Sequence, residues 1–392
     1  MKFRDLPLQA KHTFYYDVRS AVFFGVFGGL FLPFISIIGR KIGATSFEIA
    51  LLAATPYVAN AFTLLWTEDV FGKGRVWYVV WPCAIGRALL LGLFFIKNPG
   101  LYTALIFLYM LITAIPFPSY ASIMKTNYPD SVRASLMGYV RVVIAFFWII
   151  AAFISGLILN RGTLDYRYVF PVAALFGVLS AFQFGSIKVR GEKRGRESLK
   201  GIINIMTALK DRSFQEYLLI YSLFEVGLLF ALPVIPLVLV DEAHISNFAA
   251  GVYGSAFSSM WLAGFFFWGR FLDRHSIKDA LMGIFFAASL VPVIYTWSRN
   301  VYMLGVAQGI SGFVAAALEL AGYVVITRIS PSREVPRYMA ANVAASGVRG
   351  AILPFAGAWV FTAFGASPVF VLSFVSMLMA FLMAWKSMKD IG

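Results

Sequence analysis

The sequence has very few of the residues that build covalent cross-links or metal centres. Its 392 residues include one cysteine, Cys83, which excludes a disulfide within the chain and a metal cluster held by cysteines. The three histidines, His12, His244 and His275, are expected in loops or at helix ends, and none has HExxH spacing. The phosphate-binding pattern Gly-x-x-x-x-Gly-Lys-Ser/Thr is also missing. We therefore expect no catalytic residues, no metal, no cofactor and no direct use of ATP.

Charged residues are scarce as well. They make up 13% of the chain, whereas hydrophobic residues make up 60% and the mean hydropathy is +0.79. A soluble domain usually contains about 25% charged residues. The composition therefore predicts an integral membrane protein in contact with the lipid bilayer. Spans of roughly 20 residues leave room for about twelve helices, and the apolar runs are too long and continuous for the strands of a β-barrel.

The net charge of +14 has to be interpreted through its distribution. When loops are assigned between the apolar runs, those on one side carry 23 Lys and Arg residues and those on the other side carry 6. Cytoplasmic loops concentrate Lys and Arg, so the bias places both termini in the cytoplasm and the protein in the cytoplasmic membrane. The basic charge thus reflects topology, and we expect no nucleic-acid partner. The other four basic residues, Arg19, Arg87, Arg141 and Arg349, lie within apolar runs.

The apolar runs divide into two sets of six. Predicted helices cover 17–39, 47–68, 76–96, 100–124, 132–158 and 167–187, and then 215–240, 247–271, 279–298, 301–327, 335–362 and 367–387. The predicted organisation is an N-terminal six-helix bundle at 1–189, a basic cytoplasmic linker at 190–213 and a C-terminal six-helix bundle at 214–392. The linker contains either an amphipathic helix on the membrane surface or a solvated segment. Thr45 and Glu48 have the spacing of a capping box that opens the second helix.

Two pairs of charged residues recur at one offset. Asp69 and Asp273 are 204 residues apart, and so are Arg133 and Arg337. Each acid lies in a short charged loop between two long apolar runs. Repeated loops of this kind indicate a transporter that is built from two parallel halves.

The same loops resemble a signature of the major facilitator superfamily, which is a Gly, three residues, Asp, a basic residue, one residue, Gly and further basic residues. The second copy has Gly269, Asp273, Arg274 and Lys278, with Ser276 at the second Gly position; the first keeps Asp69, Gly72, Lys73 and Arg75, with Leu65 and Val70 as departures. The resemblance implies a twelve-helix secondary carrier, with Asp69, Gly72, Lys73, Gly269, Asp273 and Arg274 bracing a cytoplasmic gate. A role limited to anchoring the loops stays open.

Two carboxylates lie inside predicted helices. An ionised group at the bilayer centre costs about 2.5–3.5 kcal/mol, so Glu225 and Glu319 are expected to face a partner or a wet cavity. The resemblance implies that helices 1, 4, 7 and 10 line a central cavity, where the two acids could converge. Both are candidates for proton coupling. Two alternatives stay open: each glutamate is permanently paired with Arg349 or Arg141, or it contacts the substrate directly.

The arginines inside the helices outnumber these two acids. Asp17 and Arg19, near the cytoplasmic end of the first helix, are able to pair with each other, so one of the other arginines is expected to lack a protein partner and to suit a carboxylate or phosphate on the substrate. Arg87 is expected to have a structural partner or to extend to the membrane surface. Substrate-binding candidates are Arg141, Arg349, Asn60, Tyr57, Tyr221, Gln308 and Asn342.

The sequence favours a monomeric secondary transporter that moves a small organic solute by alternating access. Coupling to protons would use Glu225, Glu319 or both. Two alternatives stay open: an uncoupled facilitator or exporter of amphipathic compounds, and a membrane sensor or scaffold that does not transport. The fifth helix lacks a Gly- and Pro-rich run and the fourth lacks an intramembrane Arg, so the chain does not resemble drug–proton antiporters.

Overall fold

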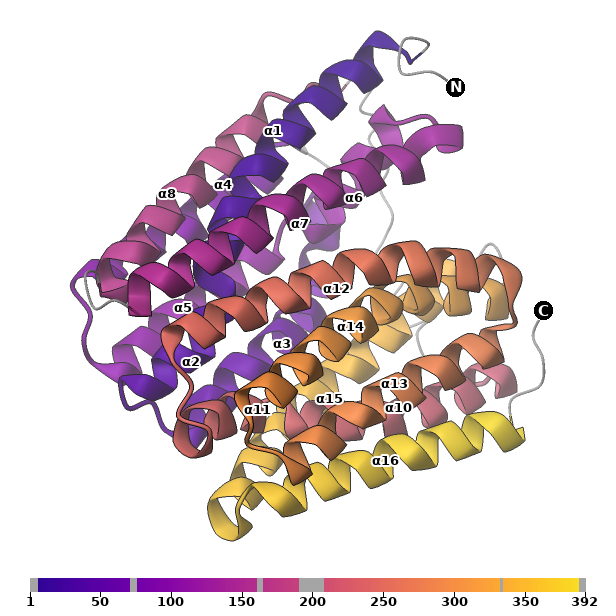
Figure 1. The fold of residues 1–392 in the computed structure, drawn as a ribbon. Helices are drawn as coiled ribbons and strands as arrows, with labels where there is room; N and C mark the ends of the chain where they lie inside the picture. The colour runs from indigo at the N-terminus through magenta and orange to yellow at the C-terminus, as the bar shows by residue number, and fades with distance from the viewer. Residues whose placement is uncertain (1–5, 71–75, 161–164, 190–207, 332–333, 388–392) are drawn as a thin grey trace. The chain divides into compact units, whose positions relative to one another are not determined.

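The computed structural model describes residues 6–70, 76–160, 165–189, 208–331 and 334–387 (Figure 1). These residues form helices and connecting turns, with no strand in the described ranges. Most of the predicted linker lies outside them, as do Gly72 and Lys73 of the first charged loop. The amphipathic helix therefore stays a prediction.

The helices follow the predicted spans closely. In chain order they are α1 Leu8–Phe31, η2 Leu32–Phe34, α2 Ile35–Lys41, α3 Ser46–Val70, α4 Trp77–Leu89, η3 Leu90–Phe94, α5 Pro99–Ala114, α6 Phe117–Asn127, α7 Asp130–Asn160, α8 Tyr166–Gly185, α10 Arg212–Ala231, α11 Val234–Leu237, η4 Val238–Glu242, α12 Asn247–Arg274, α13 Ile277–Trp297, α14 Val301–Ile329, α15 Val335–Phe364 and α16 Ala366–Ser387. Within the described ranges, nine helical segments are long and apolar enough to cross a membrane. The fold is that of an all-helical, multi-pass membrane protein.

Several spans differ from the prediction. The span 17–39 is divided among α1, η2 and α2, and 215–240 among α10, α11 and η4. The single helix predicted at 100–124 is divided into α5 and α6, with Pro116 immediately before α6. Proline lacks the N–H that an uninterrupted helix would use, so the chain ends one helix there and begins another. The first helix begins at Leu8 rather than at residue 17, because its polar first turns continue the helix beyond the apolar run.

Several helix starts have the caps that their sequences predict. The backbone N–H of Thr45 donates to Glu48 Oε2 at 2.7 Å, and the N–H of Glu48 donates to Thr45 Oγ1 at 3.2 Å, which confirms the capping box at α3. Asp211 caps α10 by accepting from the N–H groups of Ser213 and Phe214 at 2.8 and 3.3 Å. These contacts fix where the helices begin.

The chain forms two compact units, and neither is one continuous stretch. The first unit comprises Met1–Ile42, Phe62–Ser198 and Ser246–Ser255. The second comprises Gly43–Ala61, Leu199–Ile245 and Ala256–Gly392. Each unit thus includes a short segment from the opposite half of the sequence.

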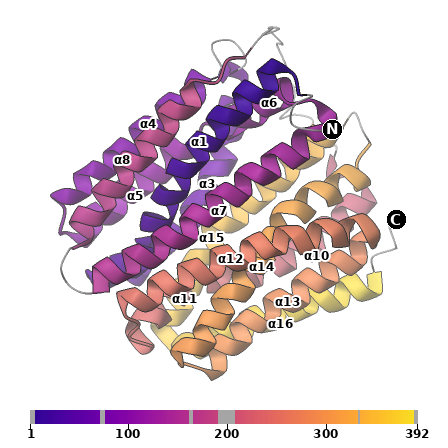
Figure 2. The ribbon, with the colours of Figure 1, turned by 45° about the horizontal axis from the view of Figure 1, so that its top comes forward.

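In the first unit, α1 packs against α7 and α8 (Figure 1 and Figure 2). Three glycines of α1 make the contact with α7 possible. A Cβ atom at Gly25 would lie 2.6 Å from the Ile144 carbonyl oxygen, and Cβ atoms at Gly28 and Gly29 would meet Trp148 at 2.6 and 2.3 Å. The backbones of α1 and α7 therefore approach each other closely, which also holds the side chains one or two turns away in register.

In the second unit, α10 packs against α15 and α16, and α13 packs against α14 and α16 (Figure 2). A core of large buried side chains that includes Phe214, Tyr217, Phe224, Phe285 and Tyr338 fills the space between these helices. Gly357 of α15 allows close packing on α10, since a Cβ there would lie 2.0 Å from the Phe230 carbonyl oxygen. This contact positions the polar residues earlier in both helices.

Candidate functional site

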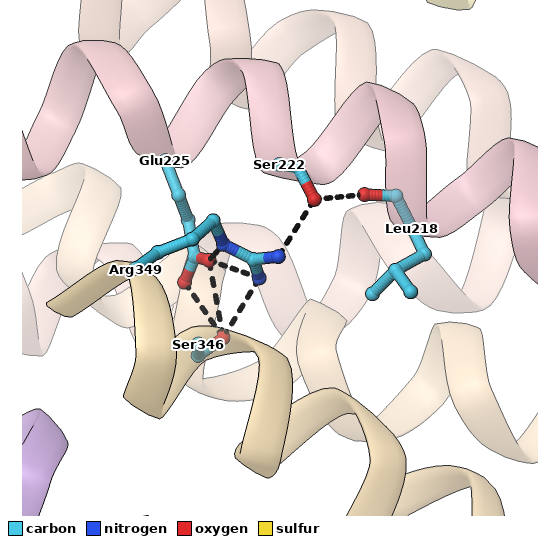
Figure 3. Close-up of polar contacts among 5 residues, drawn as sticks. All are labelled: Leu218, Ser222, Glu225, Ser346 and Arg349. Atoms are coloured by element: carbon cyan, nitrogen blue, oxygen red, sulfur yellow. Dashed lines mark hydrogen bonds and ion pairs between the residues drawn. The ribbon is translucent and has the colours of Figure 1, made fainter. Parts of the chain in front are cut away.

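A buried ion pair joins α10 to α15 in the second unit. The Nε of Arg349 donates to Oε2 of Glu225 at 2.7 Å, and the Nη2 of Arg349 contacts the same oxygen (Figure 3). The side chains are 15% exposed for Arg349 and 5% exposed for Glu225. The pairing that the sequence left as an alternative is therefore present in this conformation.

Two serines form hydrogen bonds with the members of the ion pair. The hydroxyl of Ser346 donates to Oε1 and Oε2 of Glu225 at 3.0 and 3.1 Å and accepts from Nη2 of Arg349 at 3.2 Å. The Nη1 of Arg349 donates to Ser222 Oγ at 2.7 Å, while Ser222 donates to the carbonyl of Leu218 (Figure 3). The guanidinium thus has two nitrogens, Nε and Nη2, on one carboxylate oxygen and the third, Nη1, on the Ser222 hydroxyl. These nitrogens could bind a carboxylate or phosphate equally well.

A polar stripe runs along α15, and three of its members contact α10 or the residue that caps it. At its start, the hydroxyl of Tyr338 donates to Asp211 Oδ2 at 2.8 Å. One turn later, the buried Oδ1 of Asn342 accepts no hydrogen bond within the described part of the chain. Ser346 and Arg349 follow at the ion pair. The stripe therefore forms polar contacts between the two helices, and one acceptor in it, Asn342 Oδ1, has no donor among the described residues.

Tyrosines surround the ion pair. Tyr221 lies one turn before Glu225 and stacks on Tyr217 with ring centroids 5.5 Å apart. Tyr57 of α3 packs directly on α15, because a Cβ at Gly350 would lie 2.1 Å from the Tyr57 Cβ. Both Tyr57 and Tyr221 interact electrostatically with Glu225. These two predicted substrate-binding residues thus lie near the paired charges.

Other candidates lie elsewhere. Gln308 of α14 donates to the Tyr295 hydroxyl at 3.1 Å, which gives it a local structural partner. Asn60 and Glu319 are exposed on α3 and α14. Glu319 is not among the described partners of Glu225, so the two acids do not form one cluster in this conformation.

The expected pairing of Asp17 with Arg19 is wrong. Arg19 is exposed and donates to the Tyr15 hydroxyl at 3.3 Å, whereas Asp17 is only 3% exposed and accepts from the Tyr128 hydroxyl at 3.2 Å. Residues two apart on a helix point in different directions, so the two side chains diverge. Asp17 instead interacts electrostatically with Arg141 of α7. Asp17 was expected near a helix end, so its burial as a second acid was not predicted.

Arg87 has the structural partner that was expected. It is 8% exposed in α4, its Nη1 donates to the Gly177 carbonyl at 2.8 Å, and its guanidinium carbon lies 5.1 and 5.5 Å from the ring centroids of Phe24 and Phe27. A side chain at Gly177 would displace it, because a Cβ there would lie 2.8 Å from Arg87 Cδ. Arg87 makes no ion pair with a described residue and joins α4 to α8 within the first unit.

The second copy of the loop signature lies within the described residues. Asp273 and Arg274 are exposed at the end of α12. Ser276, not Asp273, caps α13: its Oγ accepts from the Asp279 N–H at 3.1 Å and donates to Asp279 Oδ2 at 2.8 Å. A Cβ at Gly269 would meet no atom within 4 Å. The side chain of Asp69 lies outside the described side chains, and the gate stays a prediction.

The repeated arginines both bind near a helix start. Arg133 donates to the carbonyls of Lys125 and Tyr128 at 3.1 and 3.2 Å, and Arg337 pairs with Glu334 at 3.3 Å. No group of three or more His, Cys, Asp or Glu side chains in the described ranges could hold a metal ion. The polar chemistry of these ranges is therefore that of paired charges and hydroxyls.

Comparison with known proteins identifies the fold. The chain matches solved structures of the nucleoside transporter NupG (TM-score 0.71, 12% identity, 96% of this chain and 100% of that one) and of the D-xylose–proton symporter (0.67, 13%, 96% and 98%). It also matches an inward-facing, unoccupied bacterial homologue of the human lysosomal transporter Spinster (0.70, 13%, 97% and 98%). No curated protein sequence matches. The family model of the Major Facilitator Superfamily matches residues 20–232 and 217–390, and the chain therefore belongs to that superfamily of membrane transporters.

Proposed function

We propose that the protein is a secondary active transporter that carries a small organic anion through the cytoplasmic membrane by alternating access. In this proposal twelve helices span the membrane as two parallel six-helix halves, with both termini in the cytoplasm. The observation that carries the proposal is the Glu225–Arg349 pair with its serine ligands. Transport rather than catalysis agrees with the superfamily and with the functions named for the similar structures.

The ion pair can work as an exchange site. Two nitrogens of Arg349, Nε and Nη2, contact Oε2 of Glu225, and an oxygen of a substrate carboxylate or phosphate could take the same place. A substrate that binds Arg349 would displace Glu225 from the guanidinium. Tyr57 and Tyr221, which lie near the pair, would contact the body of the substrate.

Displacement of Glu225 would couple substrate to protons. A buried carboxylate that loses its guanidinium partner is left as an uncompensated charge, which a proton neutralises. Substrate binding at Arg349 would then increase proton binding at Glu225, and proton binding would strengthen substrate binding by the same factor. The carrier would move the anion and the proton together.

The test is counterflow in proteoliposomes. The panel contains organic carboxylates and phosphates, nucleosides and sugars, each measured with and without a pH gradient. We expect counterflow of at least one anion, with accumulation driven by the pH gradient. Absence of counterflow for every solute would refute transport. Counterflow that does not depend on the pH gradient would favour the uncoupled facilitator.

Three variants test which residue binds the anion and which one binds the proton. Arg349→Gln is expected to abolish anion counterflow. Glu225→Gln is expected to retain exchange and lose the dependence on the pH gradient, because the neutral amide cannot bind and release a proton. Glu319→Gln is the matched control, since Glu319 was also a proton-coupling candidate but is exposed on α14. If Glu319→Gln removes the pH dependence and Glu225→Gln does not, the coupling role belongs to Glu319.

A further inference from the structure

The acid–arginine pair of the second unit has a counterpart in the first. Asp17 precedes Glu225 by 208 residues, and Arg141 precedes Arg349 by the same 208 residues. Asp17 and Arg141 lie on α1 and α7, and Glu225 and Arg349 lie on α10 and α15. By chain order these are the first and fifth helices of each predicted half. One buried acid and one arginine thus occur at matching places in the two repeats.

Within each pair, the acid and the arginine lie at similar distances from the starts of their helices. Asp17 lies nine residues beyond the start of α1 and Arg141 eleven beyond the start of α7, which are about 14 and 16 Å at 1.5 Å per residue. Glu225 and Arg349 lie thirteen and fourteen residues beyond the starts of α10 and α15, about 20 and 21 Å. An acid and an arginine at equal depth on helices in close contact can interact.

The two acids are equally buried but differently stabilised. Asp17 is 3% exposed and Glu225 is 4% exposed. Glu225 accepts from two nitrogens of Arg349 and from the Ser346 hydroxyl. Asp17 accepts one hydrogen bond, at 3.2 Å, from the neutral hydroxyl of Tyr128. Its negative charge is therefore compensated by fewer direct contacts.

The groups near Asp17 come from α6 and the residue that follows it, from α7 and from α8. Tyr120 of α6 and Tyr128 immediately after α6 interact with it, and Arg141 supplies a positive charge from α7. The contact that α8 makes with α1 in this region is neutral, since Ser20 donates to the carbonyl of Ser180 at 2.9 Å. The surroundings contain two hydroxyls that can donate to a carboxylate or accept from a neutral carboxyl.

We propose that Asp17 is a proton-binding site, the first-half equivalent of the Glu225 centre. A hydronium ion transfers a proton to a carboxylate oxygen of Asp17 and leaves as water, the carboxyl becomes neutral, and the hydroxyl of Tyr128 changes from donor to acceptor. No other bond is made or broken. Within the transport cycle this adds a second proton to the one bound at Glu225, and that part of the inference depends on the proposed function.

The proton can be observed without any substrate. The measurement is infrared difference spectroscopy of the reconstituted full-length protein between pH steps, in H₂O and D₂O, in the region of the carboxyl C=O stretch. We expect a band from a buried protonated carboxyl that is absent in Asp17→Asn and retained in Glu225→Gln. Asp279→Asn is the control, because Asp279 is an exposed acid near the start of α13 and its removal should leave the buried band unchanged. An unchanged band in Asp17→Asn overturns the proposal.

A second variant covers the case in which Asp17→Asn does not fold. Tyr128→Phe keeps the carboxyl and removes its described hydrogen-bond donor, so the Asp17 band should persist and appear at a higher pH than in the wild type. A band that titrates identically in Tyr128→Phe contradicts the assignment to Asp17. Failure of counterflow with an intact Asp17 band would refute the transport proposal alone, whereas counterflow with no Asp17 band would refute only the second proton site.

Discussion

Removal of either charge of the Glu225–Arg349 pair should destabilise the protein more than removal of both. The two groups are in direct contact at 2.7 Å, and the side chains are 5% and 15% exposed. With charge centres about 4 Å apart and an effective dielectric constant of about 20, their attraction is about 4 kcal/mol. Loss of one partner from a buried pair costs about 3–5 kcal/mol, because the other charge is left uncompensated.

The assay is a double-mutant cycle with Glu225→Gln, Arg349→Gln and the double variant. Thermal unfolding in detergent, followed by the loss of the monodisperse size-exclusion peak, ranks their stability. We expect both single variants below the double variant and the double variant below the wild type. Single losses that add in the double variant would show that the two charges do not stabilise each other. A Glu225→Gln variant as stable as the wild type would show that Glu225 is already neutral.

Further substitutions test the packing and the caps by thermal unfolding. Gly350→Ala should destabilise the protein by about 1–3 kcal/mol, because its Cβ would lie 2.1 Å from that of Tyr57. Gly138→Ala is the control: a Cβ there would meet no atom within 4 Å, so the change should be neutral or stabilising by up to about 1 kcal/mol. Ser276→Ala should cost about 1 kcal/mol through loss of the α13 cap and Ser276→Gly only a few tenths, and equal losses in the two would refute the capping role.

The sequence predicted the helical membrane fold well because apolar runs and loop charges carry that information directly. The capping box at Thr45 and Glu48 is confirmed, and most helix boundaries lie within a few residues of the predicted ones. The division of the span at Pro116 was missed, since proline is also tolerated inside membrane helices, as Pro82 in α4 shows. A hydropathy window cannot distinguish these two situations.

The partners of the buried charges could be predicted only in part. The sequence placed Glu225 and Arg349 in two different predicted helices, and pairing of Glu225 with an arginine, Arg349 or Arg141, was one of the alternatives; the structure shows the pair with Arg349. Asp17 was missed because its neighbours in sequence, from Tyr15 to Arg19, suggest an exposed helix end. Its burial depends on Tyr128, which lies 111 residues away, and no local pattern contains that contact.

The two internal offsets, 204 and 208 residues, indicate that the acid and the arginine of each pair are positioned together. Leu8 and Arg212 begin α1 and α10 and differ by 204 residues, as the repeated loops do, whereas the two acids and the two arginines each differ by 208. Measured from the helix starts, Glu225 lies four residues further along than Asp17 and Arg349 three residues further than Arg141, so the second pair lies about one turn, or about 5–6 Å, further from the helix starts. A shift of the acid alone would separate it from its arginine by that distance and leave a buried charge without its partner, at about 3–5 kcal/mol. The acid and the arginine instead shift together by about one turn, so each pair keeps its acid and its arginine at similar distances from their helix starts.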